Sequence, residues 1–277
     1  MSIKLLAIDL DGTTLHKDTT LSIKVKKALK YILTKQVTVV PCTGRALCAL
    51  PAEITAISGI SYVITSNGAA IDHLPSGRRV YQHVLSKDVA LCVLDAAACY
   101  DVMIEVIIQG KVYTEPHFLH NLSCYGTTPA YMSYVLKTRE PVDDIYALTA
   151  QQDGGIENIN LKMADVSLLE KLRQQLSKLG TVALTASYQT NIEVSALKTS
   201  KAQAVKWLCG QFGYSMEQVM AIGDSLNDVE LLEQAGISVA MENGVPEVKR
   251  AADFITLANT EDGVAYAINH FYKEYGD

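Results

Sequence analysis

The chain carries two pairs of aspartates that could do chemistry at the ends of buried strands. Asp9 and Asp11 stand at the end of the apolar run 3–10, and Gly12 follows them directly. Because alternate residues of a strand share a face, and the strand is expected to break at Gly12, the two carboxylates can converge on one spot. A divalent cation would relieve their repulsion. One carboxylate could then act as a nucleophile and the other as a general acid or base, although an ordinary Asp-Gly turn has the same residues.

The second pair, Asp224 and Asp228, follows the apolar run 219–222 and precedes an expected helix. Acidic side chains at a helix N-terminus often serve only as caps, and Asp228 could be one of these. Four carboxylates at two strand ends of one sheet would, however, repel one another strongly without a metal. Hard oxygen ligands without a nearby His or Cys favour Mg²⁺ over zinc. The sequence therefore predicts a magnesium site.

Two further positions could bind the oxygens of a phosphate group. Thr43 follows an expected strand at 37–41, and its hydroxyl, with the backbone amides beside it at Gly44, could hold phosphate. A helix N-cap is an equally ordinary role for this threonine. Lys201 opens an expected helix, where a surface lysine is the commoner case. Chemistry alone does not separate Lys201 from Lys198.

The elements that must position these residues follow an α/β pattern. Residues 3–65 alternate as strand, helix, strand, helix, strand, which predicts a parallel sheet with helices on both faces. The pattern returns from about residue 191, with a helix at 201–212, and continues to a final helix at 263–272. Ligands bind such sheets at the carboxyl ends of the strands. The aspartates and Thr43 all fall there.

The middle of the chain has a different pattern of expected secondary structure. Its expected elements are a helix at 86–98, a hairpin of strands 102–108 and 111–114 turned by Gln109-Gly110, strands at 158–163 and 181–186, and a helix at 166–179. Residues 118–144 lack clear periodicity. The simplest interpretation is one α/β domain, residues 1–80 and 190–277, interrupted by an inserted α+β domain at 81–189.

Composition limits the partners and the compartment. The 277 residues carry a formal net charge of −6, so nucleic acid is not an expected partner. The six cysteines form no C-x-x-C pair and are expected to be reduced thiols. The chain has neither a signal-peptide pattern at its start nor a stretch long and apolar enough to span a bilayer. We therefore expect a cytoplasmic protein without membrane partners, and the oligomeric state stays open.

Together these elements resemble the haloacid dehalogenase (HAD) superfamily, in particular its Cof-type, sugar-phosphatase-like branch. The matching segments are D-x-D-G-T at Asp9–Thr13, T-G-R at Thr43–Arg45, the lysine-bearing segment Glu193–Val205 with Lys201, and G-D-x-x-N-D at Gly223–Asp228. Ser66–Ala69 and Asp262–Ile268 also look like this branch. Two departures stand out, since Ala202 replaces the usual glycine after the motif lysine and Ala196 replaces the usual proline before it. Both could alter the entry to the helix.

The resemblance implies a Rossmann-like HAD core with an inserted cap, and a magnesium-dependent phosphatase. It implies that Asp9 is the nucleophile that becomes phosphorylated, and that Asp11 is the general acid and then the general base. The implied Mg²⁺ ligands are Asp9, Asp11 through its backbone carbonyl, Asp224 and Asp228. The implied phosphate-binding residues are Thr43, Gly44, Lys201 and Asn227, the last of which positions either the phosphate or Asp228. The cap would close over the site and select the leaving group.

Two rival functions remain at this point. A phosphotransferase or mutase on the same scaffold needs the same aspartates, and only release of phosphate without an acceptor separates it from a hydrolase. A phosphate-binding signalling module with little turnover would be expected to lack a catalytic member, whereas Asp11 and Asp224 are both present. The substrate is open among sugar phosphates, flavin mononucleotide, pyridoxal phosphate and similar small molecules.

Overall fold

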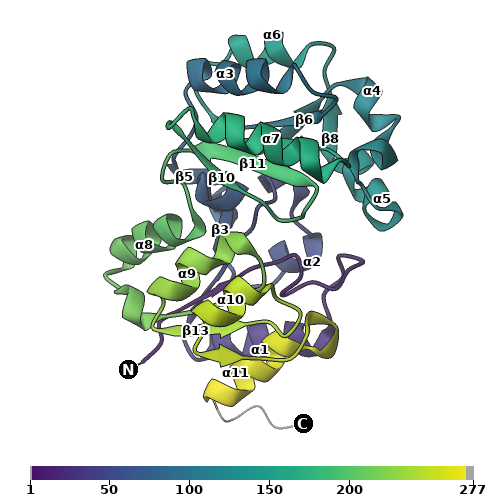
Figure 1. Ribbon diagram of the computed structural model, residues 1–277. Helices are drawn as coiled ribbons and strands as arrows, with labels where there is room; N and C mark the ends of the chain where they lie inside the picture. The colour runs from purple at the N-terminus through teal and green to yellow at the C-terminus, as the bar shows by residue number, and fades with distance from the viewer. Residues whose placement is uncertain (1, 273–277) are drawn as a thin grey trace. The chain divides into compact units, whose positions relative to one another are not determined.

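The computed structural model describes residues 2–272, apart from the side chain of Ala130. The chain divides into two compact units (Figure 1). Unit 1 consists of Met1–Thr43, Leu50–Val80 and Ser200–Asp277, and unit 2 of Gly44–Ala49 and Tyr81–Thr199. The limits of 81–189 for the inserted domain stay a prediction, and unit 2 runs on to Thr199. Within residues 2–272, no helix combines the length and the apolar character needed to cross a membrane.

Unit 1 is built on a five-stranded, fully parallel sheet in the order β14-β13-β12-β1-β2. The strands are β1 (Leu5–Ile8), β2 (Thr38–Pro41), β12 (Val219–Gly223), β13 (Ile237–Ala240) and β14 (Phe254–Ile255). The helices are α1 (Ile23–Thr34), α2 (Ala52–Thr55), α8 (Lys201–Phe212), α9 (Val229–Gln234), α10 (Pro246–Ala251) and α11 (Gly263–Tyr272). The pattern of buried central strands with flanking helices is the α/β core predicted from the sequence.

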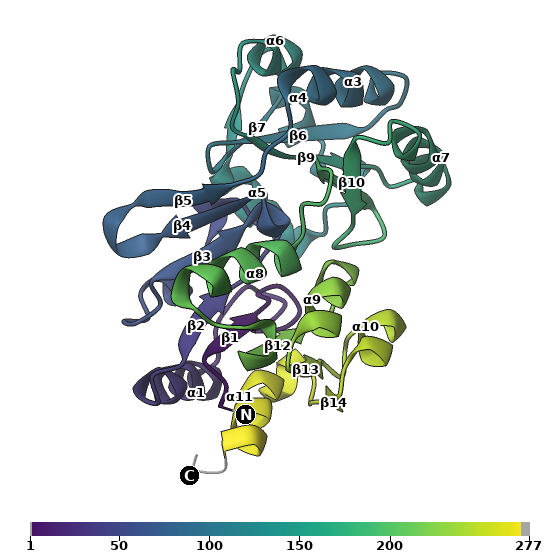
Figure 2. The same cartoon turned by 90° about the vertical axis from the view of Figure 1, so that its left-hand side faces the viewer.

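Helices cover both faces of this sheet. The buried side of α1 (Val25, Ala28, Leu29, Ile32) and that of α11 pack with Leu6, Ile8, Met220 and Ile222 in one apolar cluster. Figure 2 shows α8, α9 and α10 on the side of the sheet away from α1 and α11. Because both faces are covered, the polar edge at the carboxyl ends of the strands is the place left for chemistry.

The third strand of the sequence pattern does not join the parallel ladder. Strand β3 (Tyr62–Thr65) pairs antiparallel with β4 (Ala70–His73), and with β5 (Arg78–Gln82) they form a separate three-stranded sheet. A single parallel bridge between Cys42 and Ile64 links β3 to the end of β2. The expected third strand is therefore parallel to β2, but this pairing is limited to one bridge, and the chain turns back at once through the short 3₁₀ segment η2 (Ser66–Gly68).

Unit 2 contains a mixed six-stranded sheet in the order β10-β11-β9-β6-β7-β8. Its strands are β6 (Met103–Ile108), β7 (Lys111–Thr114), β8 (Arg139–Pro141), β9 (Ile156–Lys162), β10 (Val182–Thr185) and β11 (Asn191–Ala196). Its helices are α3 (Lys87–Ala97), α4 (Pro116–Leu119), α5 (Pro129–Thr138), α6 (Ile145–Ala150) and α7 (Val166–Ser177). Residues of α3, α6 and α7 share one apolar core with one face of the sheet.

The predicted hairpin is confirmed and its turn has a clear cause. Strands β6 and β7 pair antiparallel, with Ile108 opposite Lys111. Gln109 and Gly110 both have positive φ, of 49° and 80°. Two central residues of this kind are typical of the type I′ turn, whose twist matches that of the flanking strands.

The other face of the unit 2 sheet carries a buried ionic cluster around Glu105. Arg139 Nε donates to Glu105 Oε1 at 2.7 Å, and Lys162 Nζ lies 3.1 Å from Oε2. Asn160 Nδ2 donates to the same carboxylate at 2.7 Å. Burial alone would raise the pKa of Glu105, but the positive charges of Arg139 and Lys162 outweigh it and hold the pKa well below its usual value. The Glu105 carboxylate is thus ionised, and Arg139 and Lys162 neutralise its charge.

The first prediction concerns the stability of this cluster. Glu105→Gln is expected to lower the free energy of unfolding by about 3–5 kcal/mol, because it leaves two buried cations without their counter-charge. The matched control is Glu140→Gln, whose partner Lys111 is half exposed and whose loss should cost less than about 1 kcal/mol. Urea unfolding at neutral pH measures both.

The pKa of Glu105 is depressed in the folded state, so its contribution to stability is present at neutral pH and is lost in acid. The free energies of unfolding of the wild type and Glu105→Gln should therefore become equal as the pH falls. Equal midpoints at neutral pH would contradict the prediction.

Candidate active site

The candidate residues follow three neighbouring parallel strands, β2, β1 and β12, at one edge of the unit 1 sheet. Ile8 stands opposite both Ile222 and Pro41 in the parallel register. The backbone N–H of Asp9 continues the ladder by donating to Ile222 O at 3.0 Å. Asp9, the residue after β1, therefore lies beside the end of β12, and Asp224 is the residue after β12.

Three of the four predicted aspartates converge there. One carboxylate oxygen of each of Asp9, Asp224 and Asp228 lies within 4.8 Å of the other two. The side chain of Asp11 is not in this group among the described residues, and Asp11 is half-buried in a bridge to Leu15. The roles implied for Asp11 do not need its side chain in this cluster: its backbone carbonyl would bind the metal, and its carboxyl group would act on the leaving group and on water.

Lys201 holds the cluster together from the first turn of α8. Its side chain is fully buried, and Nζ donates to Asp9 Oδ1 at 2.6 Å and to Asp228 Oδ1 at 2.7 Å. A longer bond of 3.4 Å runs to Asn227 Oδ1. Lys198, the alternative that chemistry alone left open, is exposed. The structure therefore places Lys201, and not Lys198, against the nucleophile candidate.

The surroundings shift the pKa values of these groups strongly. Burial raises the pKa of Asp9 well above its ordinary value, and the negative charges of Asp228 and Asp224 add to this against the opposing charge of Lys201. Burial and Asp228 also raise the pKa of Asp224, to about 6. Burial would lower the pKa of Lys201, but Asp228 and Asp9 outweigh it and the pKa is raised. One buried cation is thus set against three carboxylates.

The remaining negative charge fits a divalent cation. Asp9 Oδ2 is buried and has no hydrogen-bond partner, which leaves one carboxylate oxygen of Asp9 available to a cation. Asp228 is more engaged, because its Oδ2 accepts the N–H groups of Asp224 and Ser225, both at 3.0 Å. Asp9 and Asp224 are therefore the stronger candidates for direct ligands, and Asp228 acts at least as a local cap. A set of carboxylate oxygens without His or Cys suits Mg²⁺.

Small residues let the two acidic loops approach each other. Gly12 has φ of +81°, and a Cβ there would collide with the carboxylate of Asp224. Its carbonyl accepts a hydrogen bond from Asn243 Nδ2 at 2.8 Å. Thr13 Oγ1 donates to Asp224 Oδ1 at 2.7 Å and so fixes the rotamer of that aspartate. Gly12 is thus required both for its backbone conformation and for lack of a side chain.

The candidate phosphate-binding residues are only partly assembled. Thr43 is buried, its N–H donates to Ile64 O at 2.9 Å, and its carbonyl accepts from Asn67 N at 3.0 Å. Asn227 lies against Lys201, as described above. Gly44 begins the short segment of unit 2, so its place in a phosphate site stays a prediction.

The two departures from the family pattern, Ala196 and Ala202, lie close to the start of α8. The helix begins at Lys201, and Ser200 caps it by accepting the N–H of Gln203 at 3.2 Å. Ala202 is fully buried in this first turn. Ala196 ends strand β11, within the second sheet.

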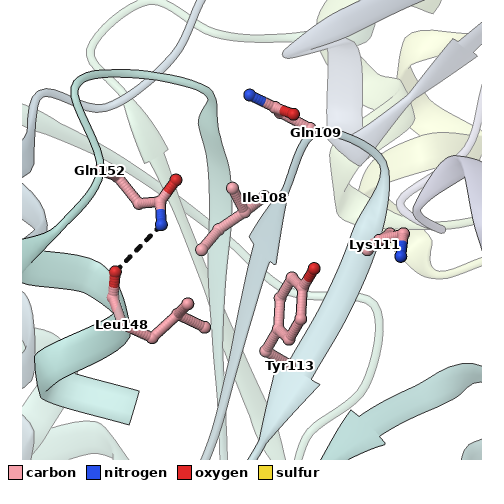
Figure 3. Close-up of a pocket in the computed structure, with 6 residues that line it drawn as sticks. All are labelled: Ile108, Gln109, Lys111, Tyr113, Leu148 and Gln152. Carbon is pink, nitrogen blue, oxygen red and sulfur yellow. Dashed lines mark hydrogen bonds between the residues drawn. The ribbon is translucent and has the colours of Figure 1, made fainter. Parts of the chain in front are cut away.

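A separate pocket of about 290 Å³ lies in unit 2 between the β6–β7 hairpin and α6. Its lining residues are Ile108, Gln109, Lys111, Tyr113, Leu148 and Gln152 (Figure 3). Gln152 Nε2 donates to the Leu148 carbonyl at 3.0 Å, and Lys111 is paired with Glu140 at 3.0 Å. The pocket contains none of the predicted catalytic residues, so it is not the candidate active site.

Comparison with known proteins decides the family. The haloacid dehalogenase-like hydrolase model matches residues 6–268. The chain belongs to this family. It is 34% identical to the 5-amino-6-(5-phospho-D-ribitylamino)uracil phosphatase YcsE of Bacillus subtilis over 98% of this chain and 96% of the relative. It is 31% identical to the phosphatase YwpJ of the same organism, over 97% and 99% of the two chains.

Solved structures agree with this assignment. A haloacid dehalogenase-like hydrolase from B. subtilis superposes with a TM-score of 0.87 at 30% identity, covering 97% of this chain and 99% of that one. The HAD fold, the Cof-type branch and the enzyme class predicted from the sequence are thereby confirmed. The protein is a HAD-type phosphatase, a phosphoric monoester hydrolase.

Proposed function

We propose that this HAD phosphatase hydrolyses small-molecule phosphate monoesters with Mg²⁺, through a phosphorylated Asp9. The observation that carries the proposal is the state of the Asp9 carboxylate. Oδ1 accepts a hydrogen bond from Lys201 Nζ at 2.6 Å, whereas Oδ2 is buried without a hydrogen-bond partner. A carboxylate held at one oxygen and unpaired at the other is positioned to act as a nucleophile or a metal ligand.

In the proposed reaction an Asp9 oxygen attacks phosphorus, and the bond between phosphorus and the ester oxygen breaks. Asp11 gives its proton to the leaving alkoxide. Asp11 then takes a proton from water as the water oxygen attacks the phospho-aspartate, which releases phosphate and restores the Asp9 carboxylate. Thr43, Gly44, Lys201 and Asn227 bind the phosphoryl oxygens. Mg²⁺, held by Asp9, the Asp11 carbonyl and Asp224 with Asp228 beside them, would neutralise charge on the transferring group.

The inserted domain is proposed to select the leaving group. The protein is proposed to act in the cytoplasm. Two relatives support a choice of first substrate: YcsE and the 30% identical YwtE of B. subtilis, whose names specify 5-amino-6-(5-phospho-D-ribitylamino)uracil. We therefore place this compound first among candidate substrates. Sugar phosphates, flavin mononucleotide and pyridoxal phosphate follow it.

The experiment is an assay of phosphate release from an aryl phosphate and from this set of compounds, with Mg²⁺ and with excess EDTA. The expected result is Mg²⁺-dependent release without any added acceptor, with one compound preferred by kcat/KM. Consumption of the substrate only when an acceptor alcohol is supplied, with the phosphoryl group transferred to that alcohol and no free phosphate released, would favour the phosphotransferase alternative. Saturable binding of phosphate compounds without turnover would favour the signalling module.

Magnesium is also expected to stabilise the protein, and more so as the pH rises. Because the pKa of Asp224 is raised to about 6, the metal-free protein loses stability between the ordinary Asp range and about pH 6, as buried carboxylates ionise. Mg²⁺ binds the ionised form and offsets this loss, by roughly 2.7 kcal/mol when its concentration is 100 times Kd. Thermal unfolding with and without MgCl₂ at about pH 5 and about pH 7.5 measures the effect.

The control for this measurement is Asp224→Asn, which should remove most of the Mg²⁺-induced shift in Tm while leaving Ser225 and Thr13 their hydrogen-bond partner. Sodium chloride at equal ionic strength separates binding of the divalent cation from screening. A shift that is the same in wild type and variant would contradict the assignment of Asp224 as a ligand.

A further inference from the structure

The turn that follows β3 presents one buried asparagine to two candidate phosphate-binding elements. Asn67 is 2% exposed and has left-handed backbone angles, φ 56° and ψ 28°. Its N–H donates to the carbonyl of Thr43 at 3.0 Å. Its Oδ1 accepts a hydrogen bond from Asn227 Nδ2 at 2.9 Å. Asn67 thus contacts both Thr43 and Asn227, which come from opposite ends of the chain.

The bond to Asn67 determines which way the Asn227 carboxamide faces. A primary amide has one donating and one accepting end. With Nδ2 committed to Asn67, Asn227 presents Oδ1 to Lys201 Nζ, at 3.4 Å. If the carboxamide turned over, its NH₂ group would face the ammonium group of Lys201, which has donors only. Asn67 therefore keeps the accepting end of Asn227 toward Lys201.

Lys201 has three N–H donors, and all three have acceptors in this structure. The bonds to Asp9 and Asp228 are short, at 2.6 and 2.7 Å, and the bond to Asn227 is the long one. A phosphoryl oxygen that binds Lys201 has to take one of these donors. The weakest bond is the least costly to exchange, so the N–H aimed at Asn227 is the one available to phosphate.

We propose that Asn67 is a positioning residue for phosphoryl transfer: through the Asn227 carboxamide it directs the third N–H of Lys201, and through its backbone it holds the Thr43 loop beside it. The inference deepens the proposed function and rests on it. Asn67 does not touch the reacting atoms. Its effect is on the alignment of two groups that bind the phosphoryl oxygens, and such alignment contributes to the rate of a transfer reaction that depends on positioning.

The backbone of Asn67 supplies a clean way to remove its side chain. Asparagine tolerates the left-handed region better than most residues, and glycine adopts it without strain. Asn67→Gly therefore deletes the carboxamide while keeping the turn and its N–H bond to Thr43. Gln36→Gly is the matched control, because Gln36 also has positive φ, of 62°, and is an exposed residue of unit 1.

The test is a double-mutant cycle in kcat with Asn67→Gly, Asn227→Ala and the double variant, on the best substrate of the set above. Asn67→Gly is expected to lower kcat about 10-fold or more, with a smaller change in KM, and Gln36→Gly to leave it unchanged. Because Asn67 acts through Asn227, the double variant should be little worse than Asn227→Ala alone. Multiplying effects, or an unchanged kcat in Asn67→Gly, would overturn the inference. A purely structural role would give multiplying effects and a lowered Tm.

Binding of inorganic phosphate in the presence of MgCl₂, measured by calorimetry, gives a second readout that does not need turnover. Weaker binding in Asn67→Gly, again without further loss in the double variant, supports the positioning role even where the wild type releases no phosphate. In that case the proposed hydrolysis fails and the positioning role stands. Equal phosphate binding in wild type and Asn67→Gly, or none in either, counts against the role of Asn67.

Discussion

Asp9→Asn is expected to lower kcat by at least about 10⁴-fold, on any substrate that the wild type hydrolyses. The carboxylate oxygen that would attack phosphorus is replaced by an amide, which is a poor nucleophile, and Asp224 and Asp228 are both held by other hydrogen bonds. Asp224 is held by Thr13 and Ser225, and Asp228 by Lys201 and two backbone N–H groups. Steady-state phosphate release measures the loss.

The same variant should keep or raise the stability of the metal-free protein. Burial and two neighbouring carboxylates raise the pKa of Asp9, so its ionised form costs folding free energy at neutral pH. Asparagine removes that charge and still offers an oxygen to Lys201. Asp18→Asn is the control, since Asp18 is an exposed residue outside the candidate site. An inactive Asp9→Asn protein that is also unfolded would not support a catalytic role, and an active one would contradict it.

Lys201→Met is expected to lose both activity and stability. Lys201 is the cation that compensates Asp9 and Asp228, and its removal leaves buried carboxylates without a partner, at a cost of about 3–5 kcal/mol. Activity should fall with it, since a donor to the phosphoryl oxygens is lost. Urea unfolding in EDTA and phosphate release in MgCl₂ measure the two effects separately.

The pH dependence distinguishes this electrostatic cause from lost packing. The pKa of Asp9 is raised, so at about pH 5 its unpaired carboxylate can take up a proton, and the deficit in stability should shrink as the pH falls. The control is Lys206→Met on the same helix, where the lysine is exposed. A deficit that is the same at both pH values, or as large in Lys206→Met, would contradict the role assigned to Lys201.

Much of the fold could be predicted because the informative elements are local. The buried strands at 5–8 and 219–223 and the helix at 201–212 follow from short apolar runs and helical periodicity. The antiparallel pairing of β3 with β4 was not predicted, because a four-residue apolar run does not reveal its partners. Strand β8 was missed because it has only three residues, of which two are exposed. Its Arg139 is held by Glu105, a contact that no local pattern reveals.

Strand β11 shows a signal that was present but not used. Its residues alternate between apolar (Ile192, Val194, Ala196) and polar (Asn191, Glu193, Ser195). Such alternation is typical of an antiparallel strand with one apolar face. It places the segment in the mixed sheet of unit 2, next to β9 and β10, although the α/β pattern was expected to resume at about residue 191.

The residues of the candidate site also divide into those predicted from local sequence patterns and those that depend on distant contacts. The aspartates were found because carboxylates at the ends of buried strands have a limited number of uses, and their spacing is local. Lys201 needed the resemblance to a family, since residue chemistry did not separate it from Lys198. Asn67 and Asn243 had no role assigned, because their function depends on contacts with Asn227 and Gly12, which lie 160 and 231 residues away in the sequence. No local pattern encodes such pairs.

The most direct test of the account is to identify the residue that carries the phosphoryl group during turnover. The enzyme is mixed with substrate and Mg²⁺, quenched in acid within a turnover and treated with borohydride, which reduces an acyl phosphate to the alcohol and converts aspartate to homoserine. Peptide mass spectrometry then locates the change. We expect homoserine at position 9 in the wild type and none in Asp9→Asn. Phosphate release without any modified aspartate, or with homoserine at another position, would contradict nucleophilic catalysis by Asp9.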